Sequence, residues 1–228
     1  MMEALTSTPL LGLTLTAAAF ALARWFQKKT GWVLANPTVV SAAMIIALLL
    51  LLDIPYDDYA RGGDFVNLML SPVTAILALG IYNQRDILKK NFIPVLVGCT
   101  VGCAVSMGSV LLLCRLFGLD QAVTAAMLPK SCTPAIAVGI AEAKGGVVAI
   151  AVACVIIAGT VGAVGAPAFI KWFHVTDPVA QGLAIGACSH ALGTTKAREI
   201  GELQGAMSSI AIGICGLLAV IFSLFLPL

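Results

Sequence analysis

Charged residues are scarce in this sequence. Asp, Glu, Lys and Arg together make 11% of the 228 residues, whereas a soluble globular domain carries about 25%. Hydrophobic residues make 60%, and the mean hydropathy is +1.04. Apolar segments follow one another from end to end, so no room remains for a separate soluble domain. The composition therefore predicts a single integral membrane domain over residues 1–228.

Catalytic and metal-binding signatures are also missing. The sequence contains no nucleophile elbow, no phosphate loop and no metal-ligand spacing, so we expect neither an enzyme nor a cofactor or metal site. All seven cysteines fall in apolar segments without a CxxC pair, and we interpret them as small core residues that form no disulfides. A formal net charge of +2 says little about partners, and no nucleic acid is expected among them.

Charge-free windows of about twenty residues mark spanning helices. Six such windows are uninterrupted, two further segments are long enough but broken, and an acidic loop with Asp57 and Asp58 follows the second window. The predicted fold class is an all-α polytopic membrane protein with about eight membrane segments. The uninterrupted windows are Ala4–Ala23, Thr30–Leu52, Phe65–Gln84, Asn91–Cys114, Gly145–Ile170 and Leu203–Leu228, and the broken segments are Gln121–Ala143 and Pro178–Gly201.

The first broken segment carries a cation between two prolines. Residues 129–134 read Pro-Lys-Ser-Cys-Thr-Pro. A lysine in the middle of a bilayer costs about 2.5–3.5 kcal/mol, and both Pro129 and Pro134 disrupt helix hydrogen bonds. A membrane tolerates such a stretch only where the backbone is buried in protein or lines a wet cavity. We therefore expect something polar to be bound or passed at Lys130.

Two prolines in the sequence begin helices that are too short to span a bilayer. Pro134 to Ala143 is ten residues and Pro72 to Gln84 is thirteen, against the roughly twenty that a span requires. Thr133 and Ser71 stand at the N-cap positions of these helices. Both helix starts are therefore predicted to lie inside the membrane, in broken or re-entrant segments.

A helix N-terminus inside the membrane attracts anions, because its amides are unpaired and its end is partially positive. Our hypothesis is that Lys130, Ser131 and the helix start at Thr133 receive a carboxylate. The alternative is that Lys130 extends to an interface, or pairs with Glu142 or Glu199 as a structural contact.

The second broken segment contains Ser189 and His190, followed by Thr194. An intramembrane histidine can carry protons near neutral pH. His190 is thus a candidate for proton coupling, together with Lys196 and Glu199 farther along the segment. The alternative is a packed histidine that bonds to another helix.

The two halves of the sequence resemble each other weakly. Ser71-Pro72 opens a short stretch of small residues before a long apolar helix, and Ser189-His190 does the same. Many transporters consist of two such repeats with interrupted helices in corresponding positions, which predicts repeats at about 30–118 and 119–228. Chance similarity between apolar segments explains the pattern equally well.

Several motifs occur in an order that is specific to one family. The chain resembles the LrgB/CidB family over essentially its whole length. In this family the first motif usually reads Pro-Lys-Ser-Val-Thr-Thr-Pro, so Pro134 comes one residue early here, and Lys196 stands where an arginine is common. The motifs are Leu128-Pro129-Lys130-Ser131, Gly145-Gly146, Ser189-His190-Ala191-Leu192-Gly193-Thr194, Glu199, and Gly205-Ala206-Met207-Ser208-Ser209, with Asn36-Pro37 and Asp53-Ile54-Pro55-Tyr56 in agreement.

The resemblance implies two functions. The first is transport of small organic carboxylates such as glycolate, glycerate or pyruvate, and it is our main expectation because a defined anion site suits a carrier. The alternative is a holin- or antiholin-like pore or regulator of murein hydrolases and autolysis, acting with a small membrane protein of the LrgA/CidA type. A homo-oligomer in the bacterial inner membrane is expected in either case. The expected substrate-binding residues are Lys130, Ser131, Thr133, Ser71, Ser189, His190 and Thr194, and the expected breaks are Pro72, Pro129 and Pro134.

Overall fold

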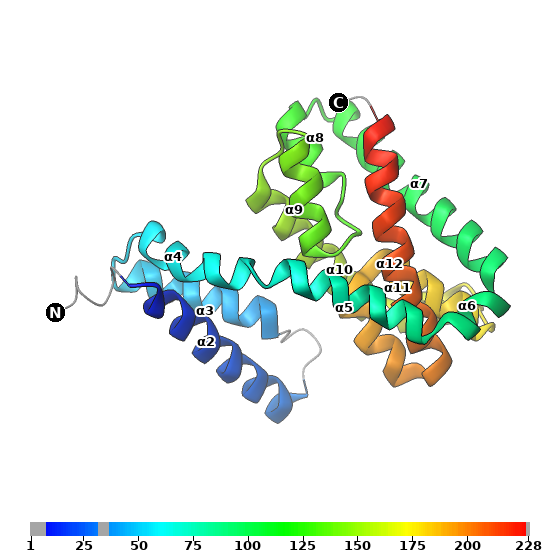
Figure 1. Cartoon of the computed structure of the whole chain (residues 1–228), viewed down its shortest axis with the longest axis horizontal. Helices are drawn as coiled ribbons and strands as arrows, with labels where there is room; N and C mark the ends of the chain where they lie inside the picture. The colour runs from blue at the N-terminus through cyan, green and yellow to red at the C-terminus, as the bar shows by residue number, and fades with distance from the viewer. Residues whose placement is uncertain (1–7, 32–36, 227–228) are drawn as a thin grey trace. The chain divides into compact units, whose positions relative to one another are not determined.

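The computed structural model describes residues 8–31 and 37–226, and all the regular secondary structure of this part is helical (Figure 1). Four described helices are long and apolar enough to cross a membrane. They are α2 (Pro9–Thr30), α7 (Phe92–Leu116), α10 (Val148–Trp172) and α12 (Glu202–Phe225). The chain forms two compact units, Met1–Thr74 and Ala75–Leu228.

The first unit packs α2 against α3 (Pro37–Leu51) and α4 (Tyr56–Asn67). Gly12 and Gly62 let α2 and α4 approach closely, because a Cβ at Gly62 would overlap the Gly12 backbone. The hydroxyls of Thr16 and Tyr59 lie 3.0 Å apart across the same contact. The acidic loop expected around Asp57 and Asp58 is wrong, because both residues lie in the first turn of α4. There the partially positive helix end stabilises their carboxylates.

α5 (Leu70–Asn83) crosses from the first unit into the second. Pro72 is its third residue, a position where the missing amide of proline removes no helix hydrogen bond. The side chain of Ser71 lies outside the described residues, and so does Asn36. The short α6 (Arg85–Lys90) precedes α7.

The centre of the second unit is the helix pair α11 (Pro178–Ile200) and α12, which lie side by side (Figure 1). Gly182 and Gly186 of α11 face the backbone of Gln204 and Ser208 on α12, and a Cβ at either glycine would overlap that backbone. Close approach through small residues is the usual way in which membrane helices gain packing energy.

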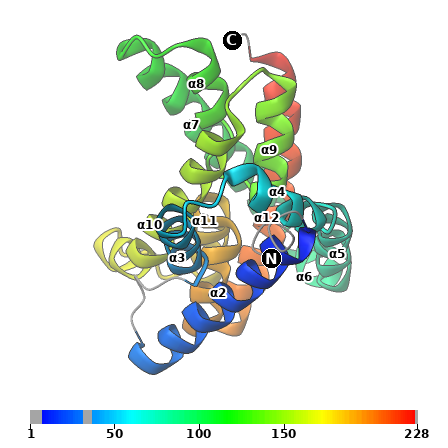
Figure 2. The same ribbon diagram turned by 90° about the vertical axis from the view of Figure 1, so that its left-hand side faces the viewer.

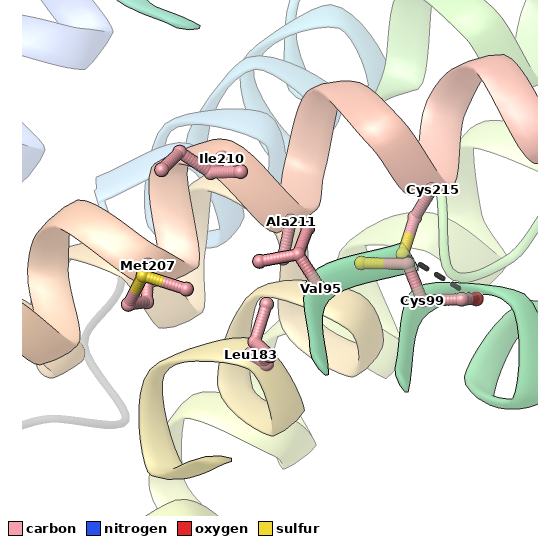
Figure 3. Close-up of a cluster of buried hydrophobic side chains, with 7 residues drawn as sticks. All are labelled: Val95, Cys99, Leu183, Met207, Ile210, Ala211 and Cys215. Carbon is pink, nitrogen blue, oxygen red and sulfur yellow. Dashed lines mark hydrogen bonds between the residues drawn. The ribbon is translucent and has the colours of Figure 1, made fainter. Parts of the chain in front are cut away.

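α7 completes the core of this unit. Its Val95 and Cys99 pack against Leu183 of α11 and against Met207 and Cys215 of α12, and Figure 3 shows these side chains meeting between the three helices. The Cys215 thiol points at the carbonyl oxygen of Cys99, 4.0 Å away. All seven cysteines are free, as the sequence predicted.

The segment between α7 and α10 is broken. α8 (Gln121–Met127) is seven residues long, and α9 (Pro134–Ala143) begins and ends where the proline and length argument placed it. Leu128, Cys132 and Ile140 of this segment pack with Met107 of α7. α9 also contacts α12, and the two helices lie beside each other in Figure 2.

Candidate functional site

The second unit contains a cavity of about 1010 Å³ between α7, α10 and α11. α11 contacts both other helices and lines the cavity with Ala180, Ala184 and Ala187, while α7 and α10 contribute further lining residues. One end of the cavity lies at the starts of α7 and α11, beside Asn91 and Asp177. The other end lies beside the α8–α9 break.

Lys130 and Ser131 of the break line this end of the cavity, together with Ser106 of α7. The ammonium of Lys130 donates to the Ser106 hydroxyl at 3.2 Å, and the hydroxyls of Ser106 and Ser131 lie 2.7 Å apart. An ammonium and two hydroxyls offer five donors, and these two hydrogen bonds engage two of them. Three donors therefore remain for an anion.

The positive charge of Lys130 has no acidic partner in the described part of the chain, where no carboxylate lies within 4.0 Å of it. Glu142 is exposed in the last turn of α9, and Glu199 pairs instead with Lys196 at 2.7 Å. The structural ion pair considered for Lys130 is thus not observed. The arrangement can bind an anion through one charge and several hydroxyl or ammonium donors.

The second polar break lies within α11. His190 has φ 42° and ψ −137°, so the helix is kinked there, and a positive φ is uncommon for a residue other than glycine. The ring is only 2% exposed, and its Nε2 lies 2.8 Å from the carbonyl oxygen of Val155 on α10. Because a carbonyl only accepts, Nε2 carries the proton, and Nδ1 is buried without a hydrogen-bond partner among the described residues.

Glycines on α10 make room for this kink. A Cβ at Gly159 would overlap the imidazole of His190, and a Cβ at Gly162 would overlap the hydroxyl of Ser189. Gly162 also lines the cavity, as does Cys188 of the kinked segment. The kink therefore lies directly behind the cavity wall, with Ser189 fully buried.

Thr194 and Ser208 hold the region after the kink to α12. The Thr194 hydroxyl donates to the carbonyl oxygen of His190 at 3.0 Å, and it lies 2.7 Å from the Ser208 hydroxyl. These groups satisfy the backbone that the kink frees, which is the role of polar side chains at breaks in membrane helices. Thr194 is buried in this contact and does not line the cavity.

Thr133 stands at the N-cap position of α9, but its hydroxyl forms no cap hydrogen bond. The side chain is 6% exposed, its oxygen has no hydrogen-bond partner in residues 8–31 and 37–226, and it does not line the cavity. The structure thus brings only Lys130 and Ser131 of the predicted binding residues to the cavity surface. Ser189, His190 and Thr194 lie behind it.

Two cavity residues were missed by the sequence reasoning. Ser106 was not among the expected binding residues, although it follows Gly98 and Gly102 at intervals of four, which places all three on one helix face. Cys188 was treated as a core residue, but it is the exposed member among the seven cysteines. No sequence signal distinguishes it from the other six.

These features define an all-helical membrane protein with two broken segments, one bearing an unpaired lysine at a cavity and the other a buried histidine. The model of the LrgB-like family matches residues 16–228. The chain belongs to this family, as the motifs predicted.

Curated relatives cover nearly the whole chain. An antiholin-like protein LrgB of Bacillus subtilis (strain 168) is 37% identical over 95% of this chain and 94% of its own length. The antiholin-like protein LrgB of Bacillus mycoides (strain KBAB4) is 36% identical over 97% of both chains. An uncharacterized protein YxaC of Bacillus subtilis (strain 168) is 37% identical over 94% of this chain and 92% of its own. No solved structure matches the chain.

Proposed function

We propose that this chain acts in a bacterial cell membrane as an antiholin-like protein, a regulator of murein hydrolases and autolysis. The support is the name borne by relatives that align over 95% and 97% of the chain. The comparisons favour this cellular role over transport. A small membrane protein of the LrgA/CidA type is the partner that this role requires, and a homo-oligomer is the expected assembly.

For the molecular activity we propose transport of small organic carboxylates such as glycolate, glycerate or pyruvate. The observation that carries it is the unpaired ammonium of Lys130 at the cavity, hydrogen-bonded to Ser106 and without a carboxylate partner in residues 8–31 and 37–226. A permanent structural charge in a membrane would be paired. A charge that binds a transported anion must be free when the site is empty.

The breaks in the helices fit the same proposal. Transporters place substrates beside interrupted helices near the membrane midplane. Here the α8–α9 break brings Lys130 to the cavity lining, and Cys188 beside the α11 kink belongs to the same lining. In the proposed arrangement both breaks lie inside the bilayer, as parts of about eight membrane segments in two repeats.

His190 serves this proposal as a structural residue. Its Nε2–H is engaged by Val155, and no carboxylate of the described chain lies within 4.0 Å to stabilise a charged ring. A buried imidazolium without a counterion is costly. We therefore assign coupling neither to His190 nor to the exposed pair Lys196–Glu199.

Counterflow of radiolabelled glycolate or pyruvate in proteoliposomes tests the transport activity. We expect saturable exchange by the wild-type protein and a loss of about 10- to 100-fold in Lys130→Ala, because a hydrogen bond to a charged group contributes about 1.5–3 kcal/mol. Lys144→Ala is the matched control, since Lys144 donates to the carbonyl oxygen of Leu226 away from the cavity. Normal uptake by Lys130→Ala at normal expression, or leakage of unrelated solutes, would contradict transport.

The cellular role is tested separately. Cells that lack the chain should show raised murein hydrolase activity and faster autolysis, and the wild-type gene should reverse both. Unchanged lysis in such cells would contradict the antiholin-like role, whatever the counterflow assay shows.

A further inference from the structure

We propose that α11 is a re-entrant hairpin, which enters and leaves the membrane on the same side. Its tip at Ser189 and His190 reaches the middle of the membrane. There it meets the α8–α9 break, which enters from the opposite side. This path of the backbone does not depend on the proposed transport, but under that proposal it places Lys130 between two opposed hairpins.

The first half of α11 runs parallel to α12. Gly182 faces the backbone of Gln204, and Gly186 faces the backbone of Ser208. A step of four residues along α11 thus matches a step of four along α12 in the same direction. Gly201 alone joins the end of α11 to the start of α12. The chain can connect two parallel neighbours in this way only if α11 turns back between Gly186 and Gly201.

The second half of α11 returns beside the same part of α12. The hydroxyls of Thr194 and Ser208 lie 2.7 Å apart, and a Cβ at Gly205 would lie 3.2 Å from the Cα atom of Arg198. Residue numbers therefore rise along α11 while they fall along α12, so this half is antiparallel to α12. Both ends of α11 thus lie beside the first turns of α12.

The two halves of α11 also pack against each other. Ile185 and Ala197 belong to one buried cluster, although a straight helix would hold residues so far apart in sequence about 18 Å from each other. A Cβ at Gly193 would lie 2.9 Å from the Cγ2 atom of Ile185. The kink at His190 is therefore the tip of a hairpin and not a bend in a spanning helix.

α10 shows how deep this tip lies, because α10 is long and apolar enough to cross a membrane. The tip contacts the middle of α10: Nε2 of His190 lies 2.8 Å from the Val155 carbonyl oxygen, and a Cβ at Gly162 would overlap Ser189. From Pro178 to the tip, α11 is about 18 Å long at 1.5 Å per residue. This length is close to half of the roughly 30 Å of a hydrocarbon core.

α9 lies along the other end of α12. A Cβ at Gly216 would overlap Ile136, near the start of α9. After the end of α9, the Lys144 ammonium donates to the Leu226 carbonyl oxygen at 2.8 Å. α9 therefore runs from the middle of α12 to its C-terminal end, and its ten residues cover about half of a span.

α8 lies on the same side as the end of α9. Ala126, near the end of α8, and Ala141, near the end of α9, share a buried cluster. The chain thus enters and leaves at the C-terminal end of α12, with the α8–α9 break as the tip. The two tips meet, since Ser131 of the break and Ala187 of α11 line one small gap together with Ser106. The carboxylate site proposed at the break therefore lies where the two hairpins meet.

Cross-linking tests the reversal of α11. The side chains of Gln181 and Gln204 are hydrogen-bonded at 3.0 Å, so Gln181→Cys combined with Gln204→Cys should form a disulfide in membranes under mild oxidation, with the linked peptides identified by mass spectrometry. The control pair combines Gln181→Cys with Leu224→Cys, at the far end of α12, and should form no disulfide. A spanning α11 would bring Gln181 to that far end. A disulfide in the control pair, or none in the first pair, would overturn the proposal.

Labelling from each side of the membrane tests both hairpins independently. The background is Cys188→Ser, which removes the exposed native thiol, and a charged, membrane-impermeant maleimide is applied to intact cells and to inverted vesicles. Single cysteines are placed at exposed positions before and after each hairpin, as Thr176→Cys and Glu202→Cys for α11 and as Leu119→Cys and Val147→Cys for α8–α9. We expect the first two to react from one side and the last two from the other side, and any other distribution would overturn the proposal.

Neither experiment measures transport, so the two proposals can fail separately. Opposed hairpins in a protein without glycolate or pyruvate counterflow would contradict transport alone. Counterflow by a protein whose Thr176→Cys and Glu202→Cys variants react from opposite sides would overturn this inference alone.

Discussion

The contact between Gly159 and His190 makes a sharp test of the kink in α11. A methyl group at position 159 would overlap the imidazole ring, which is 2% exposed and fixed by its bond to the Val155 carbonyl. The ring can move aside only by giving up that bond. Gly159→Ala should therefore destabilise the protein through the buried contact, although alanine is the better helix former.

The expected magnitude combines two costs. Overpacking a well-packed site costs about 1–3 kcal/mol, and leaving a buried polar group unsatisfied costs about 1–3 kcal/mol. Because moving the ring relieves part of the overlap, we expect Gly159→Ala to lower the free energy of unfolding by about 2–4 kcal/mol. The measurement is reversible unfolding in mixed detergent micelles as the fraction of denaturing detergent is raised.

Gly108→Ala is the matched control, because Gly108 also lies in a long membrane helix and a Cβ there would meet nothing within 4 Å. A double-mutant cycle isolates the contact. His190→Gly removes the ring and accommodates the positive φ at this position, so adding Gly159→Ala to it should cost little. Equal stability of Gly159→Ala and Gly108→Ala, or an unchanged cost in the His190→Gly background, would refute the reasoning.

Two further predictions concern hydrogen bonds of α11. Asp177→Ala should lower the free energy of unfolding by about 1 kcal/mol, because the carboxylate caps the helix through the Ala180 amide. Asp177→Asn should retain most of this capping stability, and an equal loss of stability in both variants would contradict capping. Thr194→Val should cost about 1–3 kcal/mol, since the His190 carbonyl and the Ser208 hydroxyl lose their partner, while the exposed Thr195→Val should stay within about 0.5 kcal/mol.

The broken segments could be predicted because their signals are local. Pro134 fixes where α9 begins, and the ten residues to Ala143 are too few to span a bilayer. The polar stretch at His190 likewise marks the kink of α11. In both cases the break follows from the cost of polar groups in an apolar segment, so it can be predicted without knowing which helices lie beside it.

The composition of the cavity could not be predicted in the same way. α7 is apolar on both its exposed and its buried side, with Leu112 exposed and Val95 buried, so hydrophobicity does not reveal which face meets a partner. The pairing of Ser106 with Lys130 depends on how α7 packs beside the break. α4 escaped prediction for a different reason: its acidic first turn resembles a loop by composition, and its packing on Gly12 is a tertiary contact.

The two lysines beside α9 show why Lys130 is the stronger candidate for binding an anion. Lys144 follows the end of α9 and donates to the Leu226 carbonyl at the C-terminal end of α12, where a positive charge is stabilised by the helix dipole. Among the described residues, Lys130 donates only to the Ser106 hydroxyl, which is neutral. A mid-membrane charge costs about 2.5–3.5 kcal/mol, and one neutral hydrogen bond returns about 1 kcal/mol of it. In the proposed transport, binding of the anion lowers the remaining cost, so such a site would favour occupancy without holding its ligand permanently.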